Sequence, residues 1–339
     1  MAIDDMAVKY MDTFFFEGKD VLWNYVRTIH EHPEMFDEFG QAARFNMILY
    51  GPGGTGKSTF VYRIAMVLMR HIISLDLRYS TKRELYETLY SCALRKNNNS
   101  GFISTNDKKS TFTPKDTVFL FEEFDNCLLE MYIHEKNLNK REQEKREKDI
   151  SAMDQGVKKS DFRVKDLLEL FQGPVPITGS IMVATTNDLD SIKEVCPNLF
   201  RAGRMTTIYF GYISKKTLQE LVTFYFKRPL EIYVPDKMKI PTSEIIELAL
   251  ETKMLPLDDE EKFRRFEVVL EKKIIDAEIA YDKATEASLQ AVVKGRLQNE
   301  SEQLVVEEKN LRFGEMETIS SPQVVFEKDE DVIEDEELE

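Results

Sequence analysis

The sequence predicts an α/β fold: a parallel β-sheet with helices, then a C-terminal helical lid and a long C-terminal helical extension. Between Arg44 and Ile213, five short apolar runs alternate with helical patterns, which is typical of a parallel sheet. Beyond Tyr212 the apolar spacing becomes helical. A chain of 339 residues, 42% hydrophobic and 32% charged, is long enough for two domains or for one large domain with appendages.

The predicted strands set the domain boundaries. They are Asn46 to Tyr50, His71 to Leu77, Thr117 to Phe121, Ser180 to Ala184 and Thr206 to Phe210. We expect a helical lead-in over residues 1–43, a core over 44–213, a lid over 214–255, a long helical extension over 256–313 and a disordered acidic tail over 314–339.

Two polar stretches interrupt the core. Residues 96–115 read as an exposed loop, because Asn97 to Gly101 is a run of turn-forming residues. A charged insertion spans about 130–162, and 11 of the 15 residues from Glu135 to Asp149 are charged. Six of these are basic and five acidic, so opposite charges at helical spacing predict a protruding, solvated helix.

The net charge of −15 lies mostly in the tail. The stretch Glu327 to Glu339 carries nine acids and one lysine, which leaves −7 for the other 326 residues. A negative exterior repels phosphate backbones, so a protein that coats nucleic acid broadly is not favoured. A local basic channel through which nucleic acid passes stays open.

The chain lacks the patterns of a secreted or membrane-spanning protein. The cysteines Cys92, Cys127 and Cys196 are widely spaced and form neither a disulfide framework nor a zinc motif, which favours a reducing, intracellular and cytoplasmic setting. The apolar stretch Val61 to Leu77 is interrupted by charged residues, so no membrane span is expected. Met1 to Tyr10 carries two acids where a signal peptide has basic residues.

A narrow apolar stripe begins at Phe263. Apolar or small residues recur at spacings of three and four, at positions 266, 270, 274, 277, 281, 284, 288, 291 and 295, on one long helix. Such a stripe packs either on the body of the same chain or on a partner helix. Several stripe positions are Ala, Ser or Gly, which makes a weak seam and favours packing within the chain.

A phosphate-binding loop follows the first predicted strand. Gly51 to Ser58 matches the pattern GxxxxGK[ST] and leads into a predicted helix. Glycines allow the backbone N–H groups to turn inward at a helix N-terminus, where they bind phosphate. Lys57 would reach the β- and γ-phosphates, and the Ser58 hydroxyl would bind Mg²⁺. The candidate nucleotide-binding residues are Gly51, Pro52, Gly53, Gly54, Thr55, Gly56, Lys57, Ser58 and Thr59.

Carboxylates end the third predicted strand. Val118 to Phe121 is followed by Glu122, Glu123 and Asp125, and the carboxyl ends of parallel strands face the ligand crevice. We assign Glu122 to the metal and Glu123 to the attacking water. Because neighbouring strand residues point to opposite faces, the assignment could shift by one residue, and Asp125 shares a face with Glu123.

Polar residues also follow the fourth predicted strand. If this strand lies between the first and third, Asn187 comes next to the γ-phosphate, where it can orient water. Arg201 and Arg204 stand just before the fifth strand, and in a ring they would reach the nucleotide of the neighbouring subunit. Taken alone, the pattern RxGR is more typical of a turn with solvated arginines, but its position after the fourth strand favours the finger role.

Together these motifs resemble the AAA+ ATPase superfamily over about Phe16 to Leu250. Gly51 to Ser58 corresponds to its Walker A motif, Phe119 to Glu123 to Walker B, Asn187 to sensor 1, and Arg201 with Arg204 to the arginine fingers. Glu122, the sensor Thr185-Thr186-Asn187 and the run Tyr209 to Tyr212 are more similar to the Bcs-type group, known for a mitochondrial chaperone of respiratory complex III assembly.

The resemblance implies a sheet of order 5-1-4-3-2, ATP and Mg²⁺ as ligands, a homo-oligomeric ring of six or seven subunits, and ATP-driven remodelling of a protein partner. The sequence departs from the family in four respects. The Bcs-type membrane segment is missing, no sensor 2 arginine is evident near Thr242, and the charged insertion and long helix are additions. No aromatic pore loop follows the second strand, and Tyr86 and Tyr90 are poor substitutes for one.

Two other classes of function fit the same motifs. A nucleic-acid motor, such as a helicase or genome-packaging ATPase, would need the basic channel mentioned above. A nucleotide-gated module would assemble when it binds ATP and hydrolyse little of it. Small-molecule kinases share the phosphate loop but lack the sensor strand and the finger pair.

Overall fold

The computed structural model describes residues 3–78, 80–91, 113–148, 163–172, 177–235 and 238–283. The chain divides into two compact units, residues 1–278 and 279–339, and the description below concerns the first. The acidic tail, the stripe beyond position 283, residues 149–162 of the charged insertion and most of the 96–115 loop lie outside the described residues.

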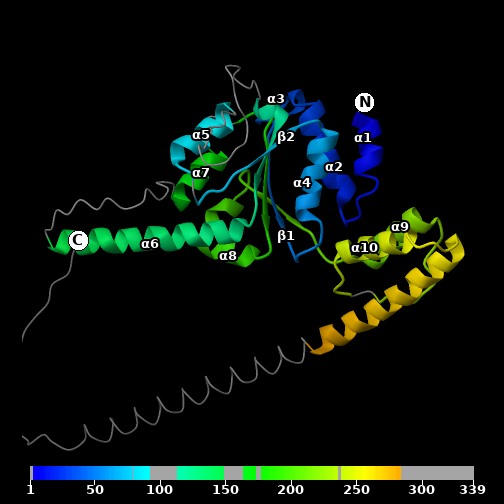
Figure 1. Ribbon diagram of the computed structural model, residues 1–339. Coiled ribbons are helices and arrows are strands. Elements are labelled where there is room, and N and C mark those ends of the chain that lie inside the picture. The colour runs from blue at the N-terminus through cyan, green and yellow to red at the C-terminus, as the bar shows by residue number, and fades with distance from the viewer. Residues whose placement is uncertain are drawn as a thin grey trace, which may run out of the picture. The chain divides into compact units, whose positions relative to one another are not determined.

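The core of the unit is a five-stranded parallel sheet (Figure 1). Its order is β2-β3-β4-β1-β5, so the predicted order 5-1-4-3-2 is confirmed, with β4 paired to both β1 and β3. The strands are β1 (Phe45–Tyr50), β2 (His71–Ser74), β3 (Thr117–Phe121), β4 (Ile181–Thr186) and β5 (Thr206–Tyr209).

The second strand is shorter than predicted. The alternating Ile73, Leu75 and Leu77 suggested a strand to Leu77, but β2 ends at Ser74. The Leu75 amide still donates to the Leu120 carbonyl at 2.8 Å, and the chain then turns at residues 77 and 78. Leu77 belongs to this turn and is fully buried, so it packs in the core although it is not part of a strand.

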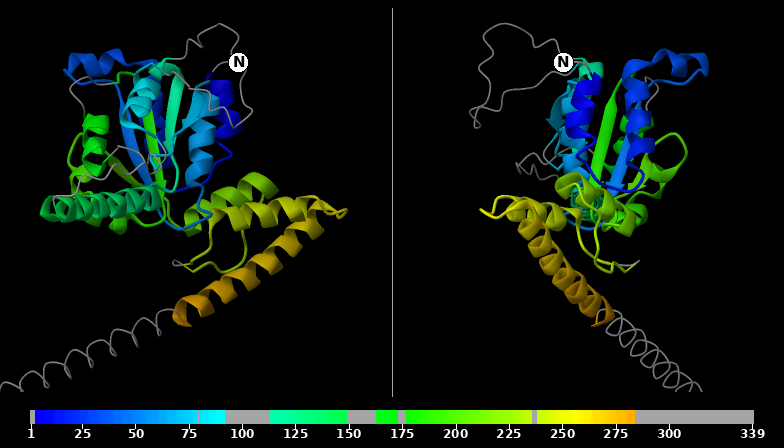
Figure 2. Two further views of the ribbon diagram at one scale, coloured as in Figure 1. Left: turned by 60° about the vertical axis from the view of Figure 1, so that its left-hand side comes forward. Right: turned by 90° about the vertical axis from the view of Figure 1, so that its right-hand side faces the viewer.

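Helices cover both faces of the sheet, as Figure 2 shows from two further directions. Met47, Leu49 and Val183 point to the face covered by α1, α2 and α4, whereas Ile48 and Met182 point to the face of α5 to α8. This strict alternation is the pleat of a strand buried on both sides. The helices are α1 (Ile3–Tyr10), α2 (Lys19–Glu31), α3 (Glu34–Glu38), α4 (Lys57–Val67), α5 (Lys82–Ser91), α6 (Phe124–Lys148), α7 (Val164–Gln172) and α8 (Leu189–Val195), with short 3-10 turns η1 (Pro114–Asp116) and η2 (Pro197–Phe200).

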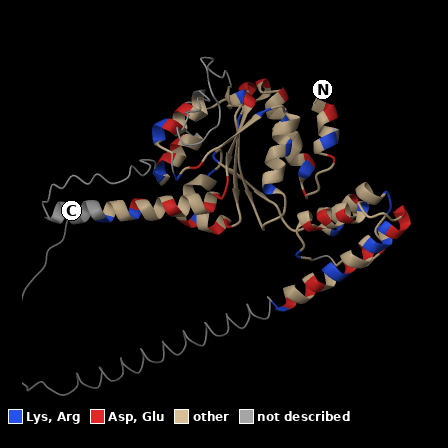
Figure 3. Ribbon diagram, viewed as in Figure 1, with Lys and Arg blue, Asp and Glu red and all other residues tan. Residues whose placement is uncertain are grey.

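Helix α6 contains the first part of the charged insertion. Figure 3 shows acidic and basic residues along it. Its first turns are anchored by Phe124 and Leu128, which are fully buried, while Ile133 is 50% exposed. The predicted helix over the charged stretch is therefore present as far as Lys148. Among the described helices, this one included, none has both the length and the apolar composition that a membrane span requires.

The lid is helical, as predicted, and it has a core of its own. Helices α9 (Lys215–Phe226) and α10 (Thr242–Lys253) pack with a further helix that begins at residue 259. Ser214 caps α9 by accepting a hydrogen bond from the Thr217 amide. The first stripe positions, Phe263, Phe266, Leu270 and Ile274, are buried in this core. The stripe thus packs inside its own chain as far as Ile274, whereas Tyr281 is exposed.

We predict that the lid depends on this stripe. Leu270 is fully buried, so Leu270→Ala should lower the free energy of unfolding by about 2–5 kcal/mol through lost contacts and the cavity left behind. Val268 lies on the same helix and is 68% exposed, so Val268→Ala should change it by less than about 0.5 kcal/mol. Urea unfolding followed by circular dichroism measures both, and equal effects would contradict the packing described.

Candidate functional site

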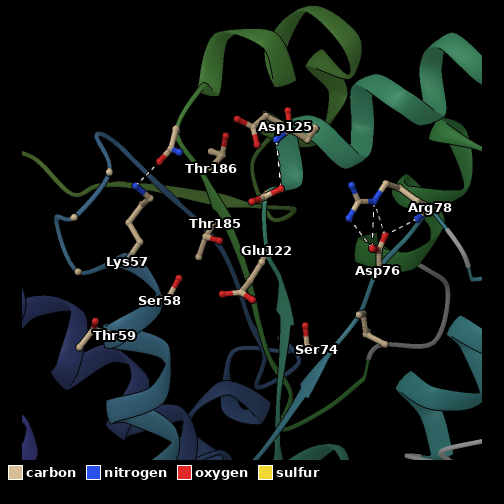
Figure 4. A pocket seen from close by; sticks show the side chains of 17 residues that line it. Lys57, Ser58, Thr59, Ser74, Asp76, Arg78, Glu122, Asp125, Thr185 and Thr186 are labelled. Atoms are coloured by element: carbon tan, nitrogen blue, oxygen red, sulfur yellow. Dashed lines mark hydrogen bonds and ion pairs between the residues drawn. The ribbon is translucent and has the colours of Figure 1, made fainter. Parts of the chain in front are cut away.

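A cavity of about 660 Å³ opens at the carboxyl ends of the parallel strands (Figure 4). Four segments line it: the loop before α4 with the first turn of that helix, the end of β2, the turn after β3, and the end of β4. Carboxyl ends of parallel strands are the usual place for ligands in such sheets. Of the nine predicted nucleotide-binding residues, six line this cavity: Gly53, Gly54, Gly56, Lys57, Ser58 and Thr59.

The other three predicted loop residues shape the loop from behind. Gly51 has φ +139°, and a side chain there would collide with the Phe210 carbonyl after β5. Thr55 is buried, and its hydroxyl donates to the Pro52 carbonyl at 2.9 Å. Gly51 and Pro52 also line a second, shallower cavity of about 430 Å³ on the β5 side of the loop.

The loop is tied to its neighbours at two more glycines. Gly56 has φ +98° and lies against the ring of Phe14, to which a Cβ would come within 3.1 Å. Gly54 accepts a hydrogen bond at 3.2 Å from the Ser243 amide in the first turn of α10. A Cβ on Gly54 would lie 2.7 Å from the Ser243 hydroxyl. The lid and the loop are therefore in direct contact.

The Lys57 ammonium lies between the phosphate loop and the end of β4. It donates to the carbonyls of Gly51 at 2.6 Å and Pro52 at 2.7 Å, and to the side-chain oxygen of Asn187 at 2.8 Å. Burial lowers the pKa of Lys57, and the negative charge of Asp125 partly offsets this effect. The predicted loop lysine and the predicted sensor residue thus lie together in the folded chain.

The carboxylate turn comprises residues 122–125 and follows β3 directly. Figure 4 shows the Glu122 side chain inside the cavity, between Ser58 and Ser74. Glu123 also lines the cavity and has φ +48°, an unfavourable conformation for a residue with a side chain. Asp125 accepts a hydrogen bond at 3.2 Å from the Asp188 amide, so it links this turn to the end of β4.

Asn187 is held where β4 passes into α8. Asp188 caps α8 by accepting bonds from the amides of Asp190 and Ser191, both at 3.1 Å. The Thr186 hydroxyl accepts from the Asp188 amide at 3.0 Å. These bonds fix the backbone on the C-terminal side of Asn187, and Thr185 and Thr186 also line the cavity.

The two predicted finger arginines are not brought to the cavity of their own chain. They lie in a turn before β5, in which the Arg204 amide donates to the Arg201 carbonyl at 3.1 Å. Arg201 is exposed, whereas the Arg204 guanidinium donates to the Asn198 carbonyl at 2.6 Å. Arg204 is thus anchored within the chain, and Arg201 faces solvent.

Sequence reasoning missed Asp76 and Arg78, which line the cavity from the end of β2. Four hydrogen bonds join Arg78 to the Asp76 carboxylate. They lower the pKa of Asp76, so this carboxylate is ionised at neutral pH. The rule that strand ends meet at one edge could have found them, but the strand was expected to run on to Leu77.

The donor set suits a hard divalent cation such as Mg²⁺. The Ser58 hydroxyl and the Glu122 carboxylate line the same cavity, and both are oxygen ligands. Among the described residues, no three His, Cys, Asp or Glu side chains are grouped to hold a metal by themselves. A Mg²⁺ ion bound by Ser58 and Glu122 therefore needs further oxygens, and those of a nucleotide phosphate are the natural source.

Comparison with known proteins agrees with these observations. Residues 47–212 match the family described as "ATPase family associated with various cellular activities (AAA)". The chain is also 26% identical, over 192 residues, to a mitochondrial AAA-ATPase of Arabidopsis thaliana. That match covers 56% of this chain and 35% of the length of the relative. The closer similarity to the Bcs-type group stays a prediction.

We predict that the two loop glycines Gly51 and Gly53 differ sharply in their tolerance of a side chain. Gly51→Ala should destabilise the protein by more than about 2 kcal/mol, because the methyl group meets the Phe210 carbonyl and the backbone angle is strained. A Cβ atom on Gly53 would have no neighbour within 4 Å, so Gly53→Ala should lower the stability by less than about 1 kcal/mol. Thermal unfolding of both variants checks this, and similar losses would be inconsistent with the loop geometry.

Proposed function

We propose that this chain hydrolyses ATP and uses the energy to remodel a protein partner, because residues 47–212 match the AAA ATPase family. One observation supports hydrolysis above the others. Lys57, Ser58, Glu122, Glu123 and Asn187 come from three separate segments, and all five line one cavity. A site that only bound nucleotide would need the loop but not the carboxylates and the amide opposite it.

In the proposed reaction, each of these side chains has one task. The backbone amides of the loop and the Lys57 ammonium bind the β- and γ-phosphates. Glu123 accepts a proton from the attacking water as the water oxygen bonds to the γ-phosphorus and the bond to the β–γ bridging oxygen breaks. Asn187, already hydrogen-bonded to Lys57, orients the water or the γ-phosphate oxygens.

The proposed cofactor is Mg²⁺, held by Ser58 and Glu122. The ion would neutralise charge on the phosphate oxygens. Glu122 is the better candidate ligand because its carboxylate lies inside the cavity next to Ser58 in Figure 4. Asp125 is occupied by the Asp188 amide, which favours Glu123 over Asp125 as the water-activating carboxylate.

We further propose that the site is completed in a homo-oligomeric ring of six or seven subunits. Arg201 is exposed and lies outside its own cavity, so a neighbouring subunit is the route by which it would reach a γ-phosphate. Arginine is suited to this task because its guanidinium stays charged and binds phosphate oxygens in pairs. Arg204 would hold the turn in shape through its bond to the Asn198 carbonyl.

The proposal of a protein partner rests on the lid and on charge. The bond between Gly54 and Ser243 gives the lid a direct contact with the phosphate loop, through which nucleotide binding could move it. The net charge of −15 disfavours a nucleic-acid partner at long range. Strong, salt-dependent stimulation of hydrolysis by DNA would instead favour the nucleic-acid motor.

We predict that binding and turnover separate between two variants. Lys57→Ala should abolish ATP binding, because the loop loses its phosphate-binding cation. Glu123→Gln should keep ATP binding and reduce the turnover number by at least about 100-fold, as loss of a general base does. Calorimetry and phosphate release measure the two properties. Glu220→Gln, on the exposed face of α9, is the matched control and should behave as the unmodified chain. Equal turnover in all three variants would refute the hydrolase.

We predict that Arg201 acts on the neighbouring subunit. Arg201→Ala should keep ATP binding but lower turnover by roughly 1,000-fold, the scale known for arginine fingers. When Arg201→Ala and Glu123→Gln chains are mixed, some interfaces combine an intact Glu123 with an intact Arg201. Turnover should therefore reappear in the mixture. If the mixture stays as inactive as its components, Arg201 does not act between subunits.

A further inference from the structure

Beside the carboxylate turn lies a cluster of four side chains that the proposed reaction does not use. Asp76 and Arg78 follow β2, and Cys127 and Glu130 belong to the first two turns of α6. Asp76 and Arg78 line the same cavity as Glu122 and Glu123 (Figure 4). The cluster therefore joins the edge of the sheet to the helix that starts at the turn.

Asp76 and Arg78 form a tight pair. Oδ1 of Asp76 accepts hydrogen bonds from the Arg78 amide and from its Nε, both at 2.9 Å, and Oδ2 accepts from Nη2 at 2.7 Å. Paired bonds between a guanidinium and a carboxylate fix the direction of both groups. The Nη1 atom of Arg78 also lies 3.5 Å from Oε1 of Glu130, so the pair extends to α6.

Cys127 connects this pair to the carboxylate turn. Its thiol lies 3.8 Å from Oδ1 of Asp76 and 3.8 Å from the carbonyl oxygen of Glu122. Its backbone amide donates to the Glu123 carbonyl at 3.0 Å. Since only 3% of Cys127 is exposed, the thiol meets the Glu122 carbonyl from a fixed position in the core.

We propose that Asp76, Arg78 and Cys127 are positioning residues for the reaction: the Asp76–Arg78 pair holds the Cys127 thiol, and the thiol holds the backbone of Glu122 at the cavity. This inference rests on the proposed ATP hydrolysis. It adds residues that act through the backbone that carries Glu122 and Glu123.

The turn needs such support, in addition to the bond that Asp125 accepts from the Asp188 amide, because it contains a strained residue. Glu123 has φ +48°, a conformation that a residue with a side chain adopts at a cost of about 1–3 kcal/mol unless its surroundings impose it. The contact from the Asn126 side-chain amide to the Glu123 carboxylate is long, at 3.5 Å. The 3.0 Å bond to the Glu123 carbonyl comes from the Cys127 backbone amide, as in any helix, so the side chain of Cys127 acts through the Glu122 carbonyl.

The first test compares Asp76→Asn with Glu130→Gln in the full-length chain. Asp76→Asn removes the charge that holds Arg78 and the thiol, whereas Glu130 lies 3.5 Å from Arg78 at the outer side of the cluster and its side chain is 60% exposed. Asp76→Asn should lower the turnover number by about 10- to 100-fold, as substitutions of residues that orient a metal ligand do. The KM for ATP should stay nearly unchanged. Glu130→Gln should leave both constants at the values of the unmodified chain.

The second test varies the thiol. Cys127→Ser keeps a hydrogen-bond donor on a shorter bond, and Cys127→Ala removes the donor. The serine variant should recover most of the turnover that the alanine variant loses, although both leave a similar space behind. If Cys127 only supported the fold, the turnover numbers of the two variants would follow their thermal stabilities and not the presence of a hydrogen-bond donor.

A binding measurement separates this inference from the proposed function. A non-hydrolysable ATP analogue is titrated by calorimetry with and without Mg²⁺. In Asp76→Asn, affinity without Mg²⁺ should be unchanged and the tightening caused by Mg²⁺ should shrink by about tenfold or more, because Glu122 is misplaced. If the unmodified chain binds the analogue but never hydrolyses ATP, the hydrolase fails while this comparison still tests the positioning. Unchanged turnover and Mg²⁺ dependence in Asp76→Asn, or equal loss of Mg²⁺-free binding, would overturn the inference.

Discussion

The parallel pairing of β1, β3 and β4 is the constraint on which the site depends. Tyr50 pairs with Thr186, so Gly51 and Asn187 each directly follow a paired residue. Phe121 pairs with Ala184, so Glu122 lies level with Thr185, two residues before Asn187, at the same edge of the sheet. Register therefore brings together residues that are more than 60 positions apart in the chain. Antiparallel pairing would have sent one of these ends to the opposite edge.

This arrangement depends on backbone conformations that the rest of the fold must hold in place. Gly51, Gly56 and Glu123 all have positive φ, and the two glycines lie against distant segments, the Phe210 backbone and the Phe14 ring. Glycine adopts such angles without strain, whereas Glu123 keeps its angle only where well-packed surroundings impose it. Here the buried aromatic residues on both sides of the sheet supply that packing, because Phe60 and Phe210 lie on one face and Phe121 and Phe124 on the other.

Sequence alone could predict the sheet, its order and most residues of the cavity, because these follow from local pattern and from one family resemblance. It could not predict what depends on where a strand stops. Leu75 and Leu77 continue the alternation of β2, so Asp76 was expected inside a strand although it faces the cavity. In the sequence, Cys127 is a thiol without a partner motif, because its contacts with Asp76 and Glu122 are tertiary. The exposed Arg201 and the anchored Arg204 look the same in the pattern RxGR.

The contact between Ser243 and Gly54 has a thermodynamic consequence. Two parts of a protein that share a bond cannot change independently, and coupling between binding sites is reciprocal. Suppose that nucleotide binding alters the conformation of the lid. A molecule that binds the lid and favours one conformation must then shift nucleotide affinity by the same factor by which nucleotide shifts the affinity for that molecule. The surface of α10 is therefore a place from which the affinity of the phosphate loop can be tuned without any contact with phosphate.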